Sequence, residues 1–122
     1  MDFDKLLTNV MNIDSTIRYA AIQNHDGEKI SGWLKDGVEP LETERDDEML
    51  YMELALRVKM RREFDTQLGS VNFAMAQRAK ALAMSFPLDH DTLSVIAESS
   101  INYSKLPDAV LKIVRKWVIY ST

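Results

Sequence analysis

The sequence predicts an α+β protein with one five-stranded antiparallel sheet and helices packed on its faces. Three observations lead to this fold class: three segments repeat apolar residues at helical spacing, five short segments favour strands, and an Asp-Gly pair joins the first two of those strands. A single sheet covered by helices is the simplest arrangement that buries all of these apolar faces. The predicted element order is α-β-β-α-β-β-β-α, in one domain over residues 1–122.

The first three elements are a short helix and a hairpin. Helical spacing over residues 2–12 puts five apolar side chains on one side, namely Phe3, Leu6, Leu7, Val10 and Met11. The segment IRYAAIQ, from Ile17, and the segment EKISGWL, after NHDG, both favour strands. Asp26 and Gly27 form the predicted turn between them, because glycine accepts a positive φ without a side-chain clash.

The rest of the chain predicts a long helix, three strands and a closing helix. Thr43 with Asp46 resembles a capping box at the start of the long helix, which is expected to run from about residue 44 to residue 65. Strands are predicted over VNFAMAQ (71–77), LAMSFPL (82–88) and TLSVIAES (92–99). The closing helix follows from the helical spacing of Leu106, Val110, Ile113, Val114 and Trp117.

The composition limits the chemistry and the partners of the protein. The 122 residues include no cysteine, which excludes disulfides, thiolate metal sites and cysteine nucleophiles and makes the cytoplasm the expected compartment. A formal charge of -4 argues against nucleic acid as a partner. No apolar run reaches the ~20 residues of a membrane span, and the first residues lack the order of a secretory signal, so no membrane insertion is expected.

Two His-Asp pairs are the strongest candidates for a catalytic or metal site. His25 precedes Asp26 in the predicted turn, and His90 lies between Asp89 and Asp91 in a second turn. Such pairs occur in metal-dependent phosphohydrolases, but two loop pairs supply neither the helical scaffold nor the number of ligands that such a centre uses. Asp, Asn and Gly favour turns, so we expect solvent-facing turn residues unless the two turns meet in space.

No catalytic, cofactor-binding or metal-binding residue is predicted. None of the serines lies in a G-x-S-x-G nucleophile elbow, and the four glycines form neither a phosphate-binding P-loop nor a GxGxxG motif. We therefore expect a protein that is not an enzyme and holds no cofactor.

The long helix is apolar nearly all round. Its apolar residues form two stripes, which consist of Met49, Met52, Leu56, Met60 and Phe64 on one side and Leu50, Leu54 and Val58 on the other. Tyr51 and Ala55 close much of the remaining circumference. A helix on one sheet needs one apolar face, so the second face must be covered by another element, a ligand or another subunit, and we favour another subunit. Acids at the start of this helix and bases at its end complement the helix dipole and would also suit two antiparallel copies.

The stretch RYAAIQNHDGEKISG, residues 18–32, resembles the opening hairpin of the roadblock/LC7 domains. In those domains the hairpin follows a first helix and precedes a long second helix, three strands and a closing helix, so the resemblance covers nearly the whole chain. The sequence is also similar to small uncharacterised archaeal proteins that share the R-Y-A-A-I pattern of residues 18–22 and the Asp-Gly turn. PAS-like and profilin-like domains have related sheet-and-helix layouts.

The resemblance implies a non-catalytic module that forms a homodimer through its second helix and an edge strand. Many roadblock domains bind or regulate small Ras-like GTPases or serve as dynein or scaffold subunits. The corresponding segments here are residues 49–64 and 71–76. The implied dimer interface contains Met49, Met52, Leu54, Ala55, Leu56, Val58, Val71 and Phe73. No motif for a GTPase contact is present, so GTPase regulation follows from the resemblance alone.

Two other functions stay open at this point. A PAS-like sensor would hold a small molecule between the sheet and its helices, with Trp33, Tyr19 or Phe73 as lining residues. A catalytic function would rest only on the two His-Asp pairs.

For the dimer, a buried charge introduced by Leu54→Glu or Met52→Glu is expected to break association or folding.

Overall fold

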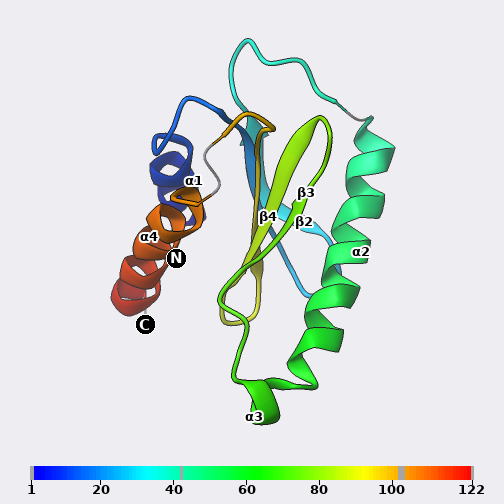
Figure 1. Cartoon of the computed structure of the whole chain (residues 1–122), viewed down its shortest axis with the longest axis vertical. Helices are drawn as coiled ribbons and strands as arrows, with labels where there is room; N and C mark the ends of the chain where they lie inside the picture. The colour runs from blue at the N-terminus through cyan, green and yellow to red at the C-terminus, as the bar shows by residue number, and fades with distance from the viewer. Residues whose placement is uncertain (1, 42, 102–103, 122) are drawn as a thin grey trace.

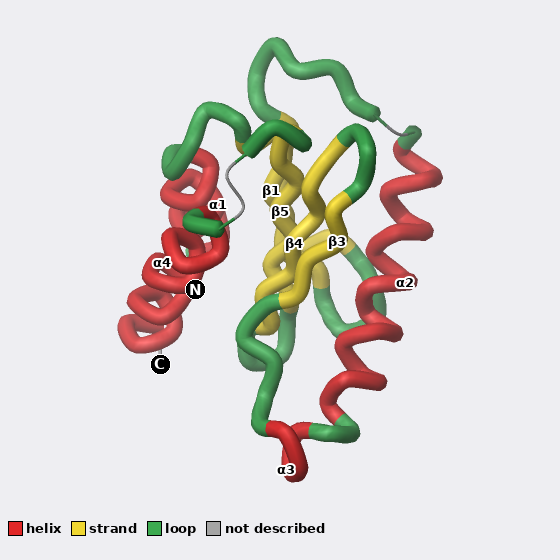
Figure 2. Tube along the Cα trace, viewed as in Figure 1, coloured by secondary structure: helices red, strands yellow, loops and turns green. Residues whose placement is uncertain are grey.

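The computed structural model describes residues 2–41, 43–101 and 104–121, with side chains described as far as residue 118. The elements along the chain are α1 (Phe3–Met11), β1 (Ile17–Gln23), β2 (Lys29–Leu34), α2 (Glu44–Arg62), α3 (Asp65–Leu68), β3 (Ala74–Gln77), β4 (Ala81–Pro87), β5 (Thr92–Glu98) and α4 (Leu106–Ser121). This order confirms the predicted α+β fold, to which the structure adds the short α3. The helices α1 and α4 lie together on one face of the sheet, and α2 lies alone on the other (Figures 1 and 2).

The strand order β2-β1-β5-β4-β3 puts the first hairpin at one edge of the sheet and β3 at the other. All four pairings are antiparallel, as predicted. Gln23 at the end of β1 lies opposite Thr92 at the start of β5. The β1–β2 turn and the β4–β5 turn therefore lie at the same end of the sheet, on neighbouring strands.

The strand β3 is shorter than predicted and begins at Ala74. In the β3–β4 register Ala74 lies opposite Ser85, and two residues earlier the same register would reach Pro87. A proline has no N–H to donate to the ladder, so pairing with β4 stops before this position. Val71 and Phe73, which were predicted on this strand, lie instead in the segment that leads into it.

The helix α2 begins with the predicted capping box. The Thr43 hydroxyl accepts a hydrogen bond from the Asp46 amide at 3.2 Å, and the Asp46 carboxylate accepts one from the Thr43 amide at 3.4 Å. These contacts satisfy amides that the first turn of a helix leaves unpaired. The helix ends at Arg62, earlier than predicted, because the next two amides bond three residues back instead of four.

The hydrophobic core lies between the sheet and the pair of helices α1 and α4. Its largest fully buried apolar side chains are Phe86, Leu6, Leu7, Ile17, Ile22, Leu82 and Leu93. Phe3 of α1 stacks on Trp117 of α4, with 5.3 Å between the ring centroids. Burial of side chains of this size contributes about 1.5–3 kcal/mol each. This layer therefore supplies the greater part of the hydrophobic stabilisation.

Part of the sheet face toward α2 carries small side chains instead. One row that the strand pairings set side by side consists of Ala74, Ser85, Ser94, Ala21 and Gly32. Small side chains bury little apolar area, so the hydrophobic effect holds α2 to the sheet less strongly than it holds α1 and α4. Specific polar contacts and shape must then fix the position of α2.

Gly27 fits the first hairpin closely against α2. Its φ is +83°, and a Cβ built on it would lie 2.9 Å from the Cα of Met52. The Gly27 amide donates a hydrogen bond to the Asn24 carbonyl at 3.0 Å, which closes the predicted Asp26-Gly27 turn. Only glycine combines this φ with so short an approach to another backbone.

Gly27→Ala is expected to lower the free energy of unfolding by about 2–4 kcal/mol, because the added methyl group meets both an unfavourable φ and the backbone of α2. Gly37→Ala is the matched control. Gly37 also has a positive φ, +79°, but no described atom lies within 4 Å of an added Cβ. A loss of about 1 kcal/mol is expected there. Urea unfolding measures the free energy of unfolding of both variants. Equal losses in the two variants would mean that the close approach of Gly27 to α2 does not add to the cost of the substitution.

Candidate interaction surface

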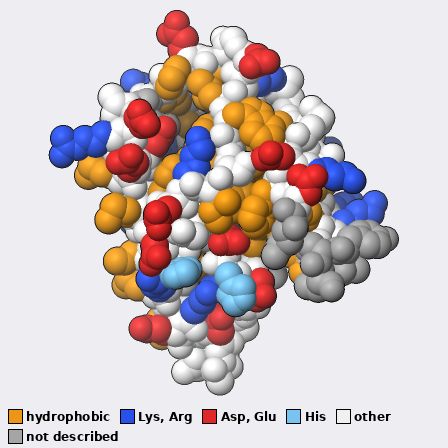
Figure 3. Space-filling model, turned by 180° about the vertical axis from the view of Figure 1, so that it is seen from behind, with side chains coloured by type: hydrophobic (Ala, Val, Ile, Leu, Met, Phe, Trp, Pro, Cys, Tyr) orange, Lys and Arg blue, Asp and Glu red, His pale blue; other side chains and the backbone are white. Residues whose placement is uncertain are grey.

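The outward face of α2 carries a row of exposed apolar side chains. Four of them, named the methionine ridge, are 52% to 62% exposed: Met49, Met52, Leu56 and Met60. Phe64 and Leu68 continue this apolar surface beyond the helix, at 56% and 82% exposure. Figure 3 shows orange side chains along the left border of the molecule, where α2 lies in that view. Single exposed apolar residues are ordinary on a protein surface, but a contiguous row on one helix indicates an interaction site.

The opposite side of α2 is buried within its own chain. Tyr51, Ala55 and Val58 are each 8% exposed. Two residues of the predicted dimer interface, Ala55 and Val58, are therefore covered before any second copy arrives. Leu54 is half-buried on the flank of α2 nearest β3 and β4.

The other predicted interface residues lie at two levels of exposure. Met49, Met52 and Leu56 belong to the open ridge. Val71 and Phe73 are half-buried, and the Phe73 ring lies 6.1 Å from that of Phe86, centroid to centroid. The structure of one chain thus divides the predicted interface into an open part on α2 and a partly covered part before β3.

Two buried hydrogen bonds of the Gln23 side chain, named the Gln23 relay, connect α2 to the sheet. Gln23 is 0% exposed and donates from Nε2 to the backbone carbonyl of Tyr51 at 2.9 Å. Its Oε1 accepts a hydrogen bond from the Ser94 hydroxyl, also at 2.9 Å. Both ends of the amide are satisfied, as burial of a polar group requires. Sequence reasoning missed this relay, because alternation along a strand predicts only which face a glutamine is on and not what covers that face.

A cleft of about 340 Å³ opens between α2 and the sheet, beside β3. Tyr51 is one of its lining residues, and the Tyr51 hydroxyl is buried and has no hydrogen-bond partner among the described residues. Of the residues predicted for a small-molecule sensor, Tyr19 lines this cleft, whereas Trp33 and Phe73 do not. Trp33 lies on the edge strand β2 and is 37% exposed.

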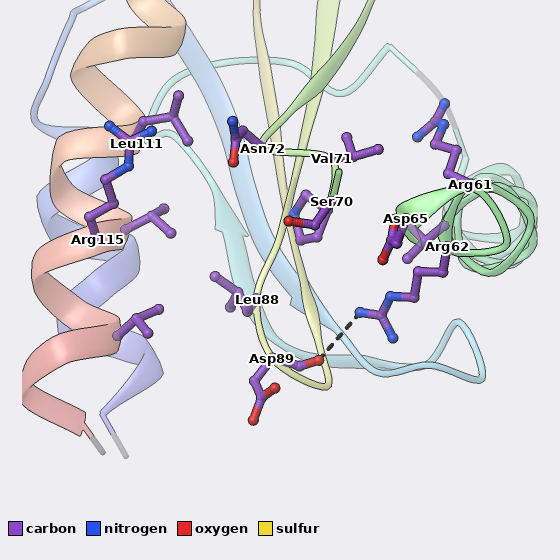
Figure 4. A pocket seen from close by; sticks show the side chains of 14 residues that line it. Arg61, Arg62, Asp65, Ser70, Val71, Asn72, Leu88, Asp89, Leu111 and Arg115 are labelled. Carbon is purple, nitrogen blue, oxygen red and sulfur yellow. Dashed lines mark hydrogen bonds between the residues drawn. The ribbon is translucent and has the colours of Figure 1, made fainter. Parts of the chain in front are cut away.

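A larger cavity, of about 590 Å³, lies between the end of α2, the segment before β3 and α4 (Figure 4). Arg62 reaches across it to the backbone carbonyl of Asp89 at 3.3 Å, and Arg115 stands on the α4 side. The Oδ1 atom of Asp65 is buried there without a hydrogen-bond partner in the described part of the chain. Most of the polar lining is open to solvent, Ser70 and Asp89 included.

The two histidine-containing turns are neighbours, the arrangement that a shared metal site would need. His25 lies 3.6 Å from the Asp26 carboxylate and His90 lies 3.4 Å from that of Asp89, and all four side chains are at least 60% exposed. Both pale-blue histidines are visible near the lower end of the face in Figure 3. Among residues 2–41, 43–101 and 104–121, no three His, Cys, Asp or Glu side chains are grouped so that they could hold a metal ion. Each histidine pairs with its own neighbour in an exposed turn.

The turn before β1 holds a carboxylate with a lowered pKa. Hydrogen bonds from the hydroxyl and the amide of Thr16, at 2.6 and 2.9 Å, hold the pKa of Asp14 below its usual range. This turn precedes β1, at the other end of that strand from the histidines.

In the described part of the chain, no helix is both long enough and apolar enough to cross a membrane.

Solved structures with the same fold share little sequence with this chain. A roadblock/LC7 domain from Streptomyces avermitilis matches with a TM-score of 0.72 and 15% identity, over 98% of this chain and 98% of that chain. MglB from Myxococcus xanthus matches with a TM-score of 0.73 and 13% identity, over 98% and 97%. Profilin II from Acanthamoeba castellanii matches with a TM-score of 0.61 and 14% identity, over 94% of both chains. The fold is therefore roadblock/LC7-like, as the first hairpin predicted, with a profilin-like layout.

Sequence comparison places the chain in a family. No curated protein sequence matches it. The model of a family of unknown function, DUF6659, matches residues 4–120, a span that includes the ridge, the cleft and both histidine turns. The chain thus belongs to the DUF6659 family.

Proposed function

We propose that this protein is a non-catalytic interaction module, that it forms a homodimer through α2 and the edge strand β3, and that the dimer binds or regulates a small Ras-like GTPase. The observation that carries the proposal is the methionine ridge, which a single chain leaves open to solvent. The roadblock/LC7-like fold supports it, because the resemblance implies dimers that use the equivalent helix and strand.

The chemistry of the ridge suits a contact between proteins. Three of its four residues are methionines, whose flexible thioether side chains adapt to the surface that they meet. Methionine is also enriched in protein–protein interfaces compared with the rest of the surface. Full burial of one such side chain contributes about 1.5–3 kcal/mol, and these four are still 52% to 62% exposed, so a partner that covers them gains part of that contribution.

Charge along α2 favours an antiparallel second copy. The acids of the first turn are Glu44, Asp46 and Asp47, and the bases of the last turn are Lys59, Arg61 and Arg62. Two antiparallel copies would set each acidic half beside the basic half of the other, which fixes the register of the contact. The unpaired backbone groups of β3 would let the same second copy extend the sheet.

The remaining parts of the proposal concern catalysis and location. We propose that the protein is not an enzyme, which the solvent-exposed His-Asp turns support. We place it in the cytoplasm because the sequence contains no cysteine. The pattern of residues 18–22 leads us to propose an archaeal origin.

Light scattering across a dilution series tests self-association. We expect a mass of twice the 14.0 kDa chain that persists into the low micromolar range. A clean monomer at every concentration would remove the second copy from the proposal and leave the ridge to a different protein.

A nucleotide-dependent pull-down tests the GTPase. Ras-like GTPases of the source organism, loaded with GDP or with a non-hydrolysable GTP analogue, are passed over the immobilised dimer. We expect retention that differs between the two nucleotides. Equal retention, or none, would contradict GTPase regulation without affecting the dimer.

A further inference from the structure

The methionine ridge holds the sulfur atoms that are most open to solvent in the described part of the chain. Its three methionines are 61% or 62% exposed: Met49, Met52 and Met60. The other described methionines are more covered, since Met75 is 37% exposed, Met11 is half-buried and Met84 is 3% exposed. The sequence contains no cysteine, so no thiol of this chain competes for an oxidant. A mild oxidant therefore meets the ridge before the other described sulfur atoms.

Oxidation would change the chemistry of the ridge without changing the fold. When hydrogen peroxide reacts with a thioether, an S–O bond forms, the O–O bond breaks, sulfur loses two electrons and the peroxide leaves as water. The product is a polar sulfoxide in place of an apolar side chain. On a single chain these side chains extend into solvent, and the hydrophobic core lies on the other face of the sheet. The oxidised chain is therefore expected to stay folded.

The same sulfoxides would oppose the binding of a second copy. Met49, Met52 and Met60 lie on one stripe with Leu56, and this stripe is about 16 Å long. A partner that covers the stripe covers all three sulfur atoms. A polar group that is buried without a hydrogen-bond partner carries a free-energy cost. Oxidation therefore acts on association, whereas the stability of the single chain is little affected.

We propose that the methionine ridge is a redox-sensitive site, at which oxidation of Met49, Met52 and Met60 by a hydroperoxide prevents the second copy from binding. This inference rests on the proposed dimer. A second copy shields the ridge, so the peroxide acts on the dissociated chain and then keeps it dissociated. Methionine sulfoxide reductases return the thioether and release water while they oxidise a dithiol, which makes the change reversible.

The test uses hydrogen peroxide as the probe and the full chain as the protein. The chain is oxidised at high dilution, where the ridge is open, and is then concentrated for light scattering. Peptide mass spectrometry measures the sulfoxide at each methionine, and circular dichroism checks the fold. We expect the ridge methionines to react faster than Met84, and the dissociation constant of the dimer to rise at least about tenfold. Treatment with both reductases and dithiothreitol should restore the dimer, because each reductase acts on one sulfoxide epimer.

Two variants assign the effect to the ridge. The triple variant Met49→Leu, Met52→Leu, Met60→Leu keeps apolar side chains of similar size and helix propensity, and peroxide does not oxidise them. It is expected to form the dimer both before and after treatment. Met75→Leu is the matched control outside the ridge, and its dimer is expected to remain as sensitive to peroxide as that of the unchanged chain.

The outcomes separate this inference from the dimer on which it rests. A chain that is a monomer before any peroxide is added would overturn the dimer and this inference together. A dimer that keeps its mass while its three ridge methionines carry sulfoxides would overturn this inference alone. So would a triple variant that loses its dimer on treatment, ridge methionines that react no faster than Met84, or loss of the dimer only together with loss of the fold.

Discussion

Leu56→Glu is expected to turn the proposed dimer into a monomer at micromolar concentration while the fold stays intact. Leu56 lies in the middle of the methionine ridge and is 52% exposed in one chain, so a glutamate there remains in water until a second copy covers it. An unpaired charge buried in an apolar contact costs about 2–5 kcal/mol. Association should weaken by roughly 30-fold to several thousandfold. Light scattering measures the mass, and circular dichroism checks the fold.

Two comparison variants make this result specific. Lys112→Glu also places a glutamate on an exposed helix position, but on α4, across the sheet from α2, and is expected to leave the mass unchanged. Leu54→Glu is expected to lower the stability of the single chain as well, because Leu54 is half-buried. A dimer that survives Leu56→Glu but not Leu54→Glu would move the interface from the ridge to the flank beside β3.

Gln23→Leu is expected to lower the free energy of unfolding by about 2–4 kcal/mol. The leucine keeps the volume but removes the bond to the Tyr51 carbonyl and leaves the buried Ser94 hydroxyl without its acceptor. The small-residue face of the sheet offers little apolar contact to replace them. Urea unfolding measures the loss, and amide hydrogen exchange should become faster in α2 than in the strands.

The double variant Gln23→Leu, Ser94→Ala is the control for this mechanism. It removes the orphaned hydroxyl, so about 1–2 kcal/mol of the loss should return. A double variant no more stable than Gln23→Leu alone would mean that the Ser94 hydroxyl finds another partner and that the relay does not hold α2. Uniform exchange across the whole chain would contradict a local release of that helix.

The sequence predicted the fold well because its local signals agree with one another. The alternation in Ile17–Gln23, the Asp26-Gly27 turn and the Thr43 capping box each involve residues close in the chain, and each depends on local geometry. The start of β3 was placed too early because its limit depends on Pro87 in a different strand. The short α3 was missed because one turn of helix gives no periodic pattern.

The candidate site could be predicted only in part. Two apolar stripes on α2 follow from spacing alone, but spacing does not say which stripe faces the sheet. The structure puts Tyr51, Ala55 and Val58 inside and leaves the ridge outside. The Gln23 relay joins residues that are 28 and 71 positions apart in the chain, so no local pattern could indicate it.

The two edges of the sheet differ in a way that bears on polymerisation. If two copies join at β3, both outer edges of the joined sheet are β2 strands. That strand begins with the exposed Lys29, contains Gly32 at φ +149°, and pairs with β1 through a register shift after Ile22. Charge, a glycine and an irregular register all discourage edge-to-edge addition of further chains. A sheet joined to a second copy at β3 would therefore resist growth into a fibril at its β2 edges.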